Sequence, residues 1–249
     1  HQMVVEEQRH QDHESLAHDE LSQIDLKENH QGTLIKSLEV IPGVQSINLG
    51  VGISKPVLRG LSMNRVAVNQ NGVRQEGQQW GSDHGLEIDP FNPEKVEVIK
   101  GPSTLRFGSG SSAGIINILP AEIAPKDTLL GDVSAIYKTN NQHLGGSARL
   151  KWNKNNWFGY AQLSAQEFGD YEVPADSFVY NTYLLPIENR RLKNTSGSER
   201  SFAAELGKTA KWGTSRLTYT TYGINTGLFP GAMGIPRSYT VAHDSNFRD

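Results

Sequence analysis

The chain has 249 residues, with 24 Lys and Arg against 27 Asp and Glu, which gives a formal net charge of -3. This balance excludes the basic footprint of a nucleic-acid-binding protein, and the absence of cysteine excludes disulfides and thiolate metal sites. No apolar run approaches the ~20 residues of a membrane helix. This does not exclude a membrane β-barrel, because its strands alternate apolar with polar residues and keep the mean hydropathy low.

Residues 1–31 form a polar, histidine-rich segment. Its composition predicts extended chain with one short strand near residues 21–26. Residues 33–40 then place apolar side chains at helical spacing behind Thr33, a residue that caps helices. Pro42 and Gly43 are expected to end this helix.

Residues 44–119 read as short strands separated by turns, and Asn71-Gly72 predicts a tight turn between two of them. One polar excursion, residues 74–90, is too long for a simple hairpin. Long excursions of this kind often carry binding residues, so we expect functional side chains here.

From residue 128 onward, apolar and polar residues alternate through about five segments, as in Val133, Ala135 and Tyr137 against Ser134 and Lys138. Two folds produce this pattern. In a soluble β-sandwich the apolar face packs on a second sheet, whereas in a membrane barrel it contacts lipid.

Two details favour the membrane barrel. Trp152 and Trp157 flank the turn at 153–156, and Trp212 lies in the next short turn, as an interfacial aromatic girdle requires. Short connections at 153–156 and 209–213 also alternate with long ones at 169–198 and 223–249. Because the smallest membrane barrels have about eight strands, we expect the rest of the barrel to come from remaining chain or from a second polypeptide.

Several motifs between residues 33 and 119 occur in a specific order. They are IPGV at 41–44, PVLRGL at 56–61, VEVIKGPS at 96–103, RFGSG at 106–110 and AGIINI at 113–118. In order and spacing, this set resembles the plug domain of TonB-dependent outer-membrane receptors. The chain departs from the family pattern at Gln70-Asn71-Gly72, where the family usually has Asp before Gly, and at Ser112-Ala113-Gly114, which lacks a common second glycine.

The resemblance implies an α+β plug domain, a short mixed sheet with small helices, followed by antiparallel strands of a transmembrane β-barrel that is incomplete in this chain. The expected division is an N-terminal segment at 1–31, a plug domain at 32–127 and barrel strands at 128–249. Met3, Val4 and Val5 are the expected TonB box, an extended segment that adds a strand to the periplasmic partner.

The resemblance further implies TonB-dependent uptake of a scarce nutrient, such as a metal or metal chelate, across the bacterial outer membrane. Expected partners are TonB, outer-membrane lipid and whatever completes the barrel, with no nucleic acid. No catalytic residue, enzymatic activity or cofactor is expected beyond a metal or metal chelate bound as substrate. The alternative function is a non-transporting β-sandwich surface binding module or adhesin.

The candidate substrate-binding residues lie in the polar excursion. They are Gln79, Trp80, Asp83, His84 and Glu87. Trp80 can stack on a ligand, and Asp83 with His84 can bind a metal ion. The alternative is a solvated loop with its own internal hydrogen bonds.

Two arginines, Arg59 and Arg106, are implied by the family to face barrel carboxylates and to lock the plug in place. The alternative is that both are solvated surface residues.

The segment from Gly110 to Gly114 fits the G-x-S-x-G pattern of a hydrolase nucleophile elbow. That elbow needs a helix after the serine, but a β-branched run at 115–118 follows and Pro120 ends it, so we expect no hydrolase site.

Overall fold

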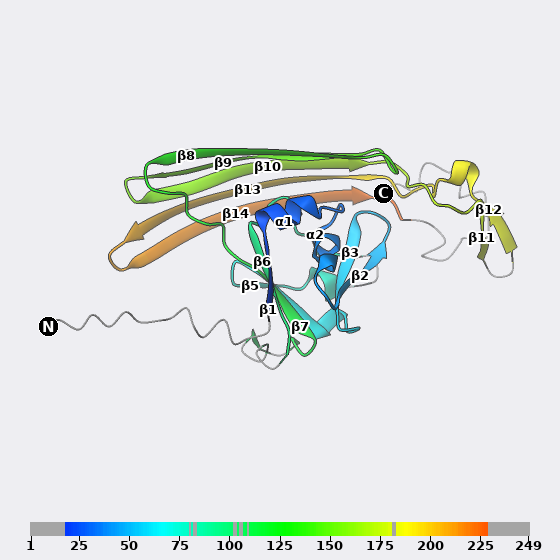
Figure 1. Cartoon of the computed structure of the whole chain (residues 1–249), viewed down its shortest axis with the longest axis horizontal. Coiled ribbons are helices and arrows are strands. Elements are labelled where there is room, and N and C mark those ends of the chain that lie inside the picture. The colour runs from blue at the N-terminus through cyan, green and yellow to red at the C-terminus, as the bar shows by residue number, and fades with distance from the viewer. Residues whose placement is uncertain are drawn as a thin grey trace.

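The computed structural model describes residues 18–79, 81, 84–101, 104, 107–108, 110–180 and 183–228. Two layers face each other: a plug domain, residues 18–119, and a long antiparallel sheet made of β8, β9, β10, β13 and β14 (Figure 1). Among the described residues, no helix is both long enough and apolar enough to cross a membrane.

The plug contains two small sheets and short helices. Its elements are β1 (His18–Ser22), α1 (Gln23–Glu28), α2 (Leu34–Ser37), η1 (Leu38–Val40), β2 (Val44–Leu49), β3 (Ile53–Leu58), η2 (Met63–Arg65), β4 (Val66–Gln70), β5 (Val73–Gln75), η3 (Gly77–Gln79), β6 (Lys95–Ile99) and β7 (Gly114–Ile118). The larger sheet has the order β1-β6-β7-β4-β5, and β2 pairs only with β3. The sheet is mixed, as predicted, because β4 and β7 run parallel while its other pairs are antiparallel.

The first described residues belong to the plug. β1 pairs antiparallel with β6 along its whole length. The strand predicted near 21–26 therefore lies earlier, and α1 occupies most of that range. The reason is a capping box: the Asp25 carboxylate accepts from the Ser22 backbone N–H at 2.9 Å, and the Ser22 side chain accepts from the Asp25 backbone N–H. Residues 18–28, expected in the N-terminal segment, thus pack with the plug.

Two local predictions for the plug are confirmed. Thr33 caps α2 by accepting a hydrogen bond from the Lys36 backbone N–H at 3.4 Å, and η1 continues the helix to Val40. Asn71 and Gly72 both have positive φ, at 53° and 80°, and join β4 to β5 in a two-residue turn.

The plug core lies between its helices and its larger sheet. Its fully buried side chains include Leu38, Leu58, Val66, Val68, Val96, Val98 and Ile116. β7 starts where the backbone passes close beneath Leu58, since a Cβ added at Gly114 would lie 2.6 Å from Leu58 Cδ1. A strand thus follows Gly114 directly, with no helix, which excludes the nucleophile elbow.

The long sheet follows the predicted alternation. Its strands and the elements between them are β8 (Thr128–Lys138), β9 (His143–Lys154), β10 (Trp157–Phe168), β11 (Ser177–Tyr180), β12 (Tyr183–Pro186), η5 (Glu188–Arg190), β13 (Gly197–Ala210) and β14 (Gly213–Thr226). The sheet order is β14-β13-β10-β9-β8, all antiparallel, and gives the five strands that the sequence predicts.

The apolar face of the long sheet points away from the plug. Its side chains include Val133, Leu163 and Leu217, which are 81%, 63% and 74% exposed. Within the described part of the chain, no second sheet covers this outer face; the plug covers the opposite, polar face instead (Figure 1). The β-sandwich alternative is therefore wrong, because it requires the apolar face to be the packed one.

The connections at the two ends of the sheet differ in length. At one end, Asn155–Asn156 and residues 211–212 form two-residue turns, and Trp157 and Trp212 lie at this end as predicted. At the other end, residues 169–196 form an excursion that carries the β11–β12 hairpin (Figure 1), although the turn at 139–142 between β8 and β9 is short. β14 extends to Thr226, so the loop predicted from residue 223 starts later.

Candidate functional site

The plug–wall interface is the contact between the plug and the inner, polar face of the long sheet. The plug contributes residues 27–33 and 89–94, and the connection to β8 contributes residues 121–124. The sheet contributes inward side chains of β8, β9, β10, β13 and β14. Because strand side chains alternate, this face receives every second residue, and those residues are mostly polar.

A buried ion cluster lies at the centre of this interface. Glu94, from the loop before β6, pairs with Arg149 and, at 2.8 Å, with Lys151, both from β9. Burial raises the pKa of Glu94, but the hydrogen bond from Lys151 and the charge of Arg149 outweigh it and hold that pKa below its ordinary value. Arg149 also donates to Gln162 Oε1 at 2.5 Å and to the Asn92 carbonyl. The cluster therefore fixes the plug to two neighbouring strands.

A second buried carboxylate lies on the same seam. Asp89 accepts from the Ser164 hydroxyl of β10 at 2.6 Å and from the Phe91 backbone N–H at 2.9 Å. Burial is the main cause that raises the pKa of Asp89 above its ordinary value, and these hydrogen bonds oppose it.

Beside them, a hydrogen-bonded chain crosses from the plug to three strands. His143 Nε2 lies 2.9 Å from Gln166 Oε1, and Gln166 Nε2 donates to the Gly32 carbonyl at 2.8 Å and to Glu199 Oε2 at 2.5 Å. His30 stacks on Phe91 with ring centroids 4.5 Å apart. Burial, followed by the charges of Lys138 and His143, lowers the pKa of His30 to about 4, so its ring is neutral near pH 7.

The two margins of the interface carry more exposed contacts. Lys27 of α1 pairs with Asp132 of β8 at 2.7 Å. On the far side, Arg216 of β14 donates to the Ala121 carbonyl at 2.7 Å and pairs with Glu205 at 2.9 Å. The plug and the connection that follows it thus touch both edge strands of the described sheet.

A cavity of 390 Å³ lies at the long-loop end, between the plug and β14. Its lining residues are Gly52, Ile53, His84, Gly85, Leu86, Glu87, Tyr222, Ile224, Asn225, Thr226 and Leu228. The plug supplies an imidazole and a carboxylate, while the inward side chains of β14 supply a phenol and a hydroxyl. Both apolar and polar side chains line it, as in most small-ligand sites.

The structure brings together two of the five predicted substrate-binding residues. His84 and Glu87 are exposed and both line this cavity. Gln79 lies in η3 and is half-buried, away from the cavity lining. Trp80 and Asp83 lie outside the described residues.

The other predicted site residues are not brought to this cavity. Arg59 is exposed at a positive φ of 51°, and no described carboxylate pairs with it. Arg106 and the expected TonB box at Met3, Val4 and Val5 lie outside the described residues. Among the side chains that the structure does describe, no group of three or more His, Cys, Asp or Glu residues is placed to hold a metal ion.

Sequence reasoning missed Tyr222, Glu94 and Arg149. A partial signal existed for Arg149 and Tyr222, because alternation places both on the polar face of their strands. It also missed Gln78, which is fully buried and whose amide nitrogen and oxygen have no hydrogen-bond partner among the described residues.

Comparison with known proteins gives a consistent picture. The family model of the TonB-dependent receptor plug domain matches residues 14–115. The vitamin B12 transporter BtuB of Photobacterium profundum is 28% identical over 127 residues, which cover 49% of this chain and 21% of that protein. The hemin receptor of Yersinia enterocolitica is 32% identical over 157 residues, which cover 58% of this chain and 22% of that protein.

Solved structures agree on the fold. The copper transporter OprC superposes with a TM-score of 0.66 at 20% identity, covering 85% of this chain and 31% of that one. A ferric enterobactin receptor mutant of Pseudomonas aeruginosa superposes with a TM-score of 0.60 at 15% identity, covering 85% and 35%. The chain spans about a fifth of the length of the two curated relatives above. The chain thus carries the plug domain of a TonB-dependent outer-membrane receptor, packed on the inner face of outward-apolar strands.

Proposed function

We propose that this chain serves TonB-dependent active uptake of a scarce nutrient, a metal ion or metal chelate, across the outer membrane. The observation that carries the proposal is the cavity lined jointly by the plug and β14. A ligand bound there contacts the part that is expected to move and the part that is fixed in the membrane. Binding can then be coupled to plug rearrangement with no chemical reaction at the protein, no catalytic residue and no cofactor.

The cavity chemistry supports a metal-containing or polar substrate. His84 and Glu87 offer the nitrogen and oxygen atoms that bind transition metals, and Tyr222 and Thr226 add hydroxyl groups. Names of the relatives and similar structures refer to vitamin B12, hemin, ferric aerobactin and copper. Trp80 and Asp83 of the same excursion are proposed as further ligand contacts, and Gln79, which does not line the cavity, is proposed to contact a ligand that extends beyond it.

Energy for uptake is proposed to come through TonB. Met3, Val4 and Val5 would add a strand to that partner, as extended peptides do at exposed sheet edges. Arg59 and Arg106 would hold the plug by facing carboxylates of barrel strands other than the five described. Those strands, from remaining chain or a second polypeptide, would complete the barrel.

The test is uptake and surface binding of radiolabelled metal and metal chelates by cells that express the receptor, with and without TonB. Suitable variants are His84→Ala and Glu87→Gln, with Glu76→Gln as the matched control. Glu76 is an exposed carboxylate of the same excursion that does not line the cavity. Loss of one charged contact is expected to weaken binding roughly tenfold, and Glu76→Gln should change nothing.

Without TonB, surface binding should persist while accumulation stops. The proposed function would be rejected if accumulation were equal with and without TonB. The assignment of the cavity alone would be rejected if Glu87→Gln and Glu76→Gln bound and accumulated the substrate equally.

A further inference from the structure

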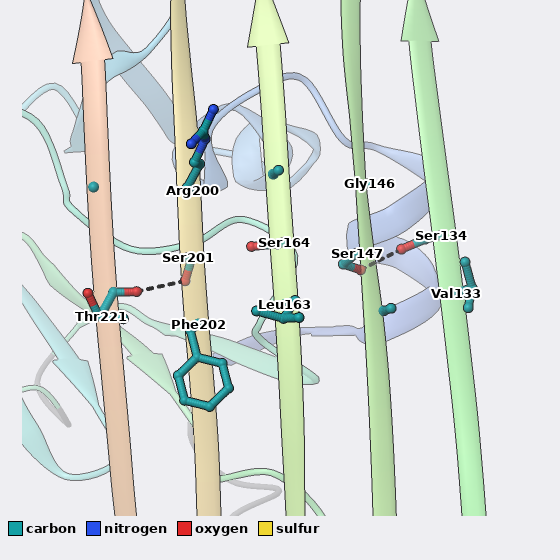
Figure 2. A pocket seen from close by; sticks show the side chains of 13 residues that line it. Val133, Ser134, Gly146, Ser147, Leu163, Ser164, Arg200, Ser201, Phe202 and Thr221 are labelled. Carbon is teal, nitrogen blue, oxygen red and sulfur yellow. Dashed lines mark hydrogen bonds between the residues drawn. The ribbon is translucent and has the colours of Figure 1, made fainter.

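The outer, lipid-facing surface of the long sheet has a hollow of 720 Å³ toward its long-loop end. All five strands contribute to its lining, from Val133 on β8 to Thr221 and Gly223 on β14, and four serines of the alternate, inner rows (Ser134, Ser147, Ser164 and Ser201) also border it. Figure 2 shows Arg200, Phe202, Leu163 and Val133 around it, on the side of the strands away from the plug. The hollow therefore belongs to the membrane-facing side and is separate from the substrate cavity.

The pairing register explains the shape of the hollow. One row across the outer face carries small residues beside one arginine: Ala135, Gly146, Ala165, Arg200 and Gly223. The row on the short-turn side is bulkier and contains Val133, Ala148, Leu163, Phe202 and Thr221. A low row beside a higher one forms a furrow across the strands, and the Arg200 side chain lies in it between Ala165 and Gly223.

Arg200 is an unusual residue for this face. It is exposed, and no described carboxylate forms an ion pair with it. The other outward cations of the sheet, Lys154 and Lys208, lie at the short-turn end, where the Lys208 ammonium is 4.9 Å from the Trp157 ring centroid. A guanidinium facing lipid is costly unless it reaches the polar interface or an anion.

The depth of Arg200 places it near the polar interface. It precedes Lys208 by eight residues on β13. With a rise of about 3.3 Å per residue and a tilt of about 40°, that separation is roughly 20 Å along the membrane normal. The apolar band of such barrels is about 25 Å tall, and long loops mark the extracellular side. Arg200 thus lies where phosphate groups of the outer leaflet meet the acyl chains.

Polar side chains complete the surroundings of Arg200. In the next row toward the long loops, Ser198 of β13 is paired with Asn225 of β14, and both point outward. Glu167 of β10 occupies the same row on the other side of Ser198. Its carboxylate repels anions, so it confines an anionic group to the space among Arg200, Ser198 and Asn225.

We propose that this surface binds one phosphorylated glycolipid of the outer leaflet. Its phosphate lies on the Arg200 guanidinium, with the Ser198 hydroxyl and the Asn225 amide as further donors, and an acyl chain lies in the furrow. A guanidinium suits phosphate because its planar fork donates two parallel hydrogen bonds. The small residues of the furrow let an acyl chain approach the backbone closely, and the neighbouring bulky row borders that chain.

The test is native mass spectrometry of the purified receptor in detergent, titrated with diphosphorylated lipid A or with the same lipid after removal of its phosphates. Arg200→Gln removes the cation, and Lys208→Gln is the matched control at the opposite end of the same strand. Ala165→Phe fills the furrow without changing charge. Thermal unfolding of each variant checks that the barrel still folds.

Arg200→Gln is expected to weaken binding of diphosphorylated lipid A roughly tenfold, the weight of one hydrogen bond to a charged group. Lys208→Gln should bind diphosphorylated lipid A like the parent, and Ala165→Phe should bind it less tightly. The parent should bind the dephosphorylated lipid no more tightly than Arg200→Gln binds diphosphorylated lipid A. Equal binding by the parent and Arg200→Gln would overturn the proposal. So would equal losses in Arg200→Gln and Lys208→Gln, or a second receptor copy occupying the face in place of lipid.

Discussion

Replacing Glu94 by glutamine tests directly what holds the plug against the long sheet. The substitution keeps the size of the side chain and removes its charge. Arg149, only 3% exposed, then loses the carboxylate that compensates it, and Lys151 loses the same partner. Because both cations belong to β9, all of the effect should appear at the plug–wall interface.

The expected cost is set by burial. Removing one partner of a buried ion pair typically costs about 3–5 kcal/mol, because the remaining charge stays desolvated. Arg149 keeps its hydrogen bonds to Gln162 and the Asn92 carbonyl, so the lower end applies. A loss of about 3 kcal/mol corresponds to a rise of roughly a hundredfold in the population of the locally released plug.

Amide hydrogen exchange of the receptor in detergent measures that population, read on peptides that cover residues 89–99. Glu20→Gln is the control, because it removes the Glu20–Lys95 pair at 2.8 Å, whose side chains are 39% and 33% exposed. An exposed pair is worth about 0–1 kcal/mol, so the control should change exchange by less than about fivefold.

Glu94 does not hold the plug against the long sheet if Glu94→Gln accelerates exchange no more than Glu20→Gln does. A second variant locates the cause. Combining Glu94→Leu with Arg149→Met removes both charges of the main pair, and exchange should return most of the way to the parent value, since apolar pairs often replace buried ion pairs at little cost. Exchange as fast as in Glu94→Gln would show that lost packing, not the uncompensated charge, is responsible.

Two further predictions concern the same interface, and a third concerns packing between strands of the long sheet. Because the pKa of His30 is lowered to about 4 from an ordinary 6.5, its contribution to stability is present above pH 6.5 and is lost as the pH falls towards 4. In His30→Asn, the free energy of unfolding should therefore depend less on pH between 6.5 and 4 than it does in the parent. Burial raises the pKa of Asp89, so its contribution to stability is greatest below pH 3.8 and is lost as the pH rises through the raised pKa. At pH 7, Asp89→Asn should therefore lower the free energy of unfolding, measured by chemical denaturation, by under about 1 kcal/mol. A Cβ at Gly207 would clash with the Phe158 ring, so Gly207→Val should lower the free energy of unfolding by about 1–3 kcal/mol. The yield of folded barrel, measured on gels of unheated samples, should fall for Gly207→Val. It should not fall for Gly131→Val, because a Cβ at Gly131 meets nothing within 4 Å.

The strands of the long sheet could be predicted because side-chain direction has a period of two residues. Inward and outward residues of β8 to β14 were therefore visible in the sequence, as were the turn at Asn71-Gly72 and the helix behind Thr33. The start of the plug was harder. The Ser22–Asp25 capping box is a local signal for α1, but β1 becomes a strand only by pairing with β6, some 75 residues later.

The candidate site shows the same division. His84 and Glu87 could be proposed from one polar excursion, and both line the cavity. Tyr222 could not be joined to them, because more than 130 residues separate it from the excursion and only docking of the plug on the sheet brings them together. Glu94 and Arg149 likewise meet across 55 residues, and no spacing rule relates residues of two different layers.

The direction of β1 has a mechanical consequence. In Figure 1, β1 runs across the direction of the long strands, and it is the edge strand of its sheet. A force applied at His18 parallel to the long strands would therefore load its five pairs with β6 one after another, as in opening a zip, starting at His18–Ile99. Each step opposes roughly one backbone hydrogen bond, about 1 kcal/mol, so the strand should detach at low force. The next attachments to the wall would be Lys27–Asp132 and the Gly32–Gln166 hydrogen bond, and they would set how far the plug opens.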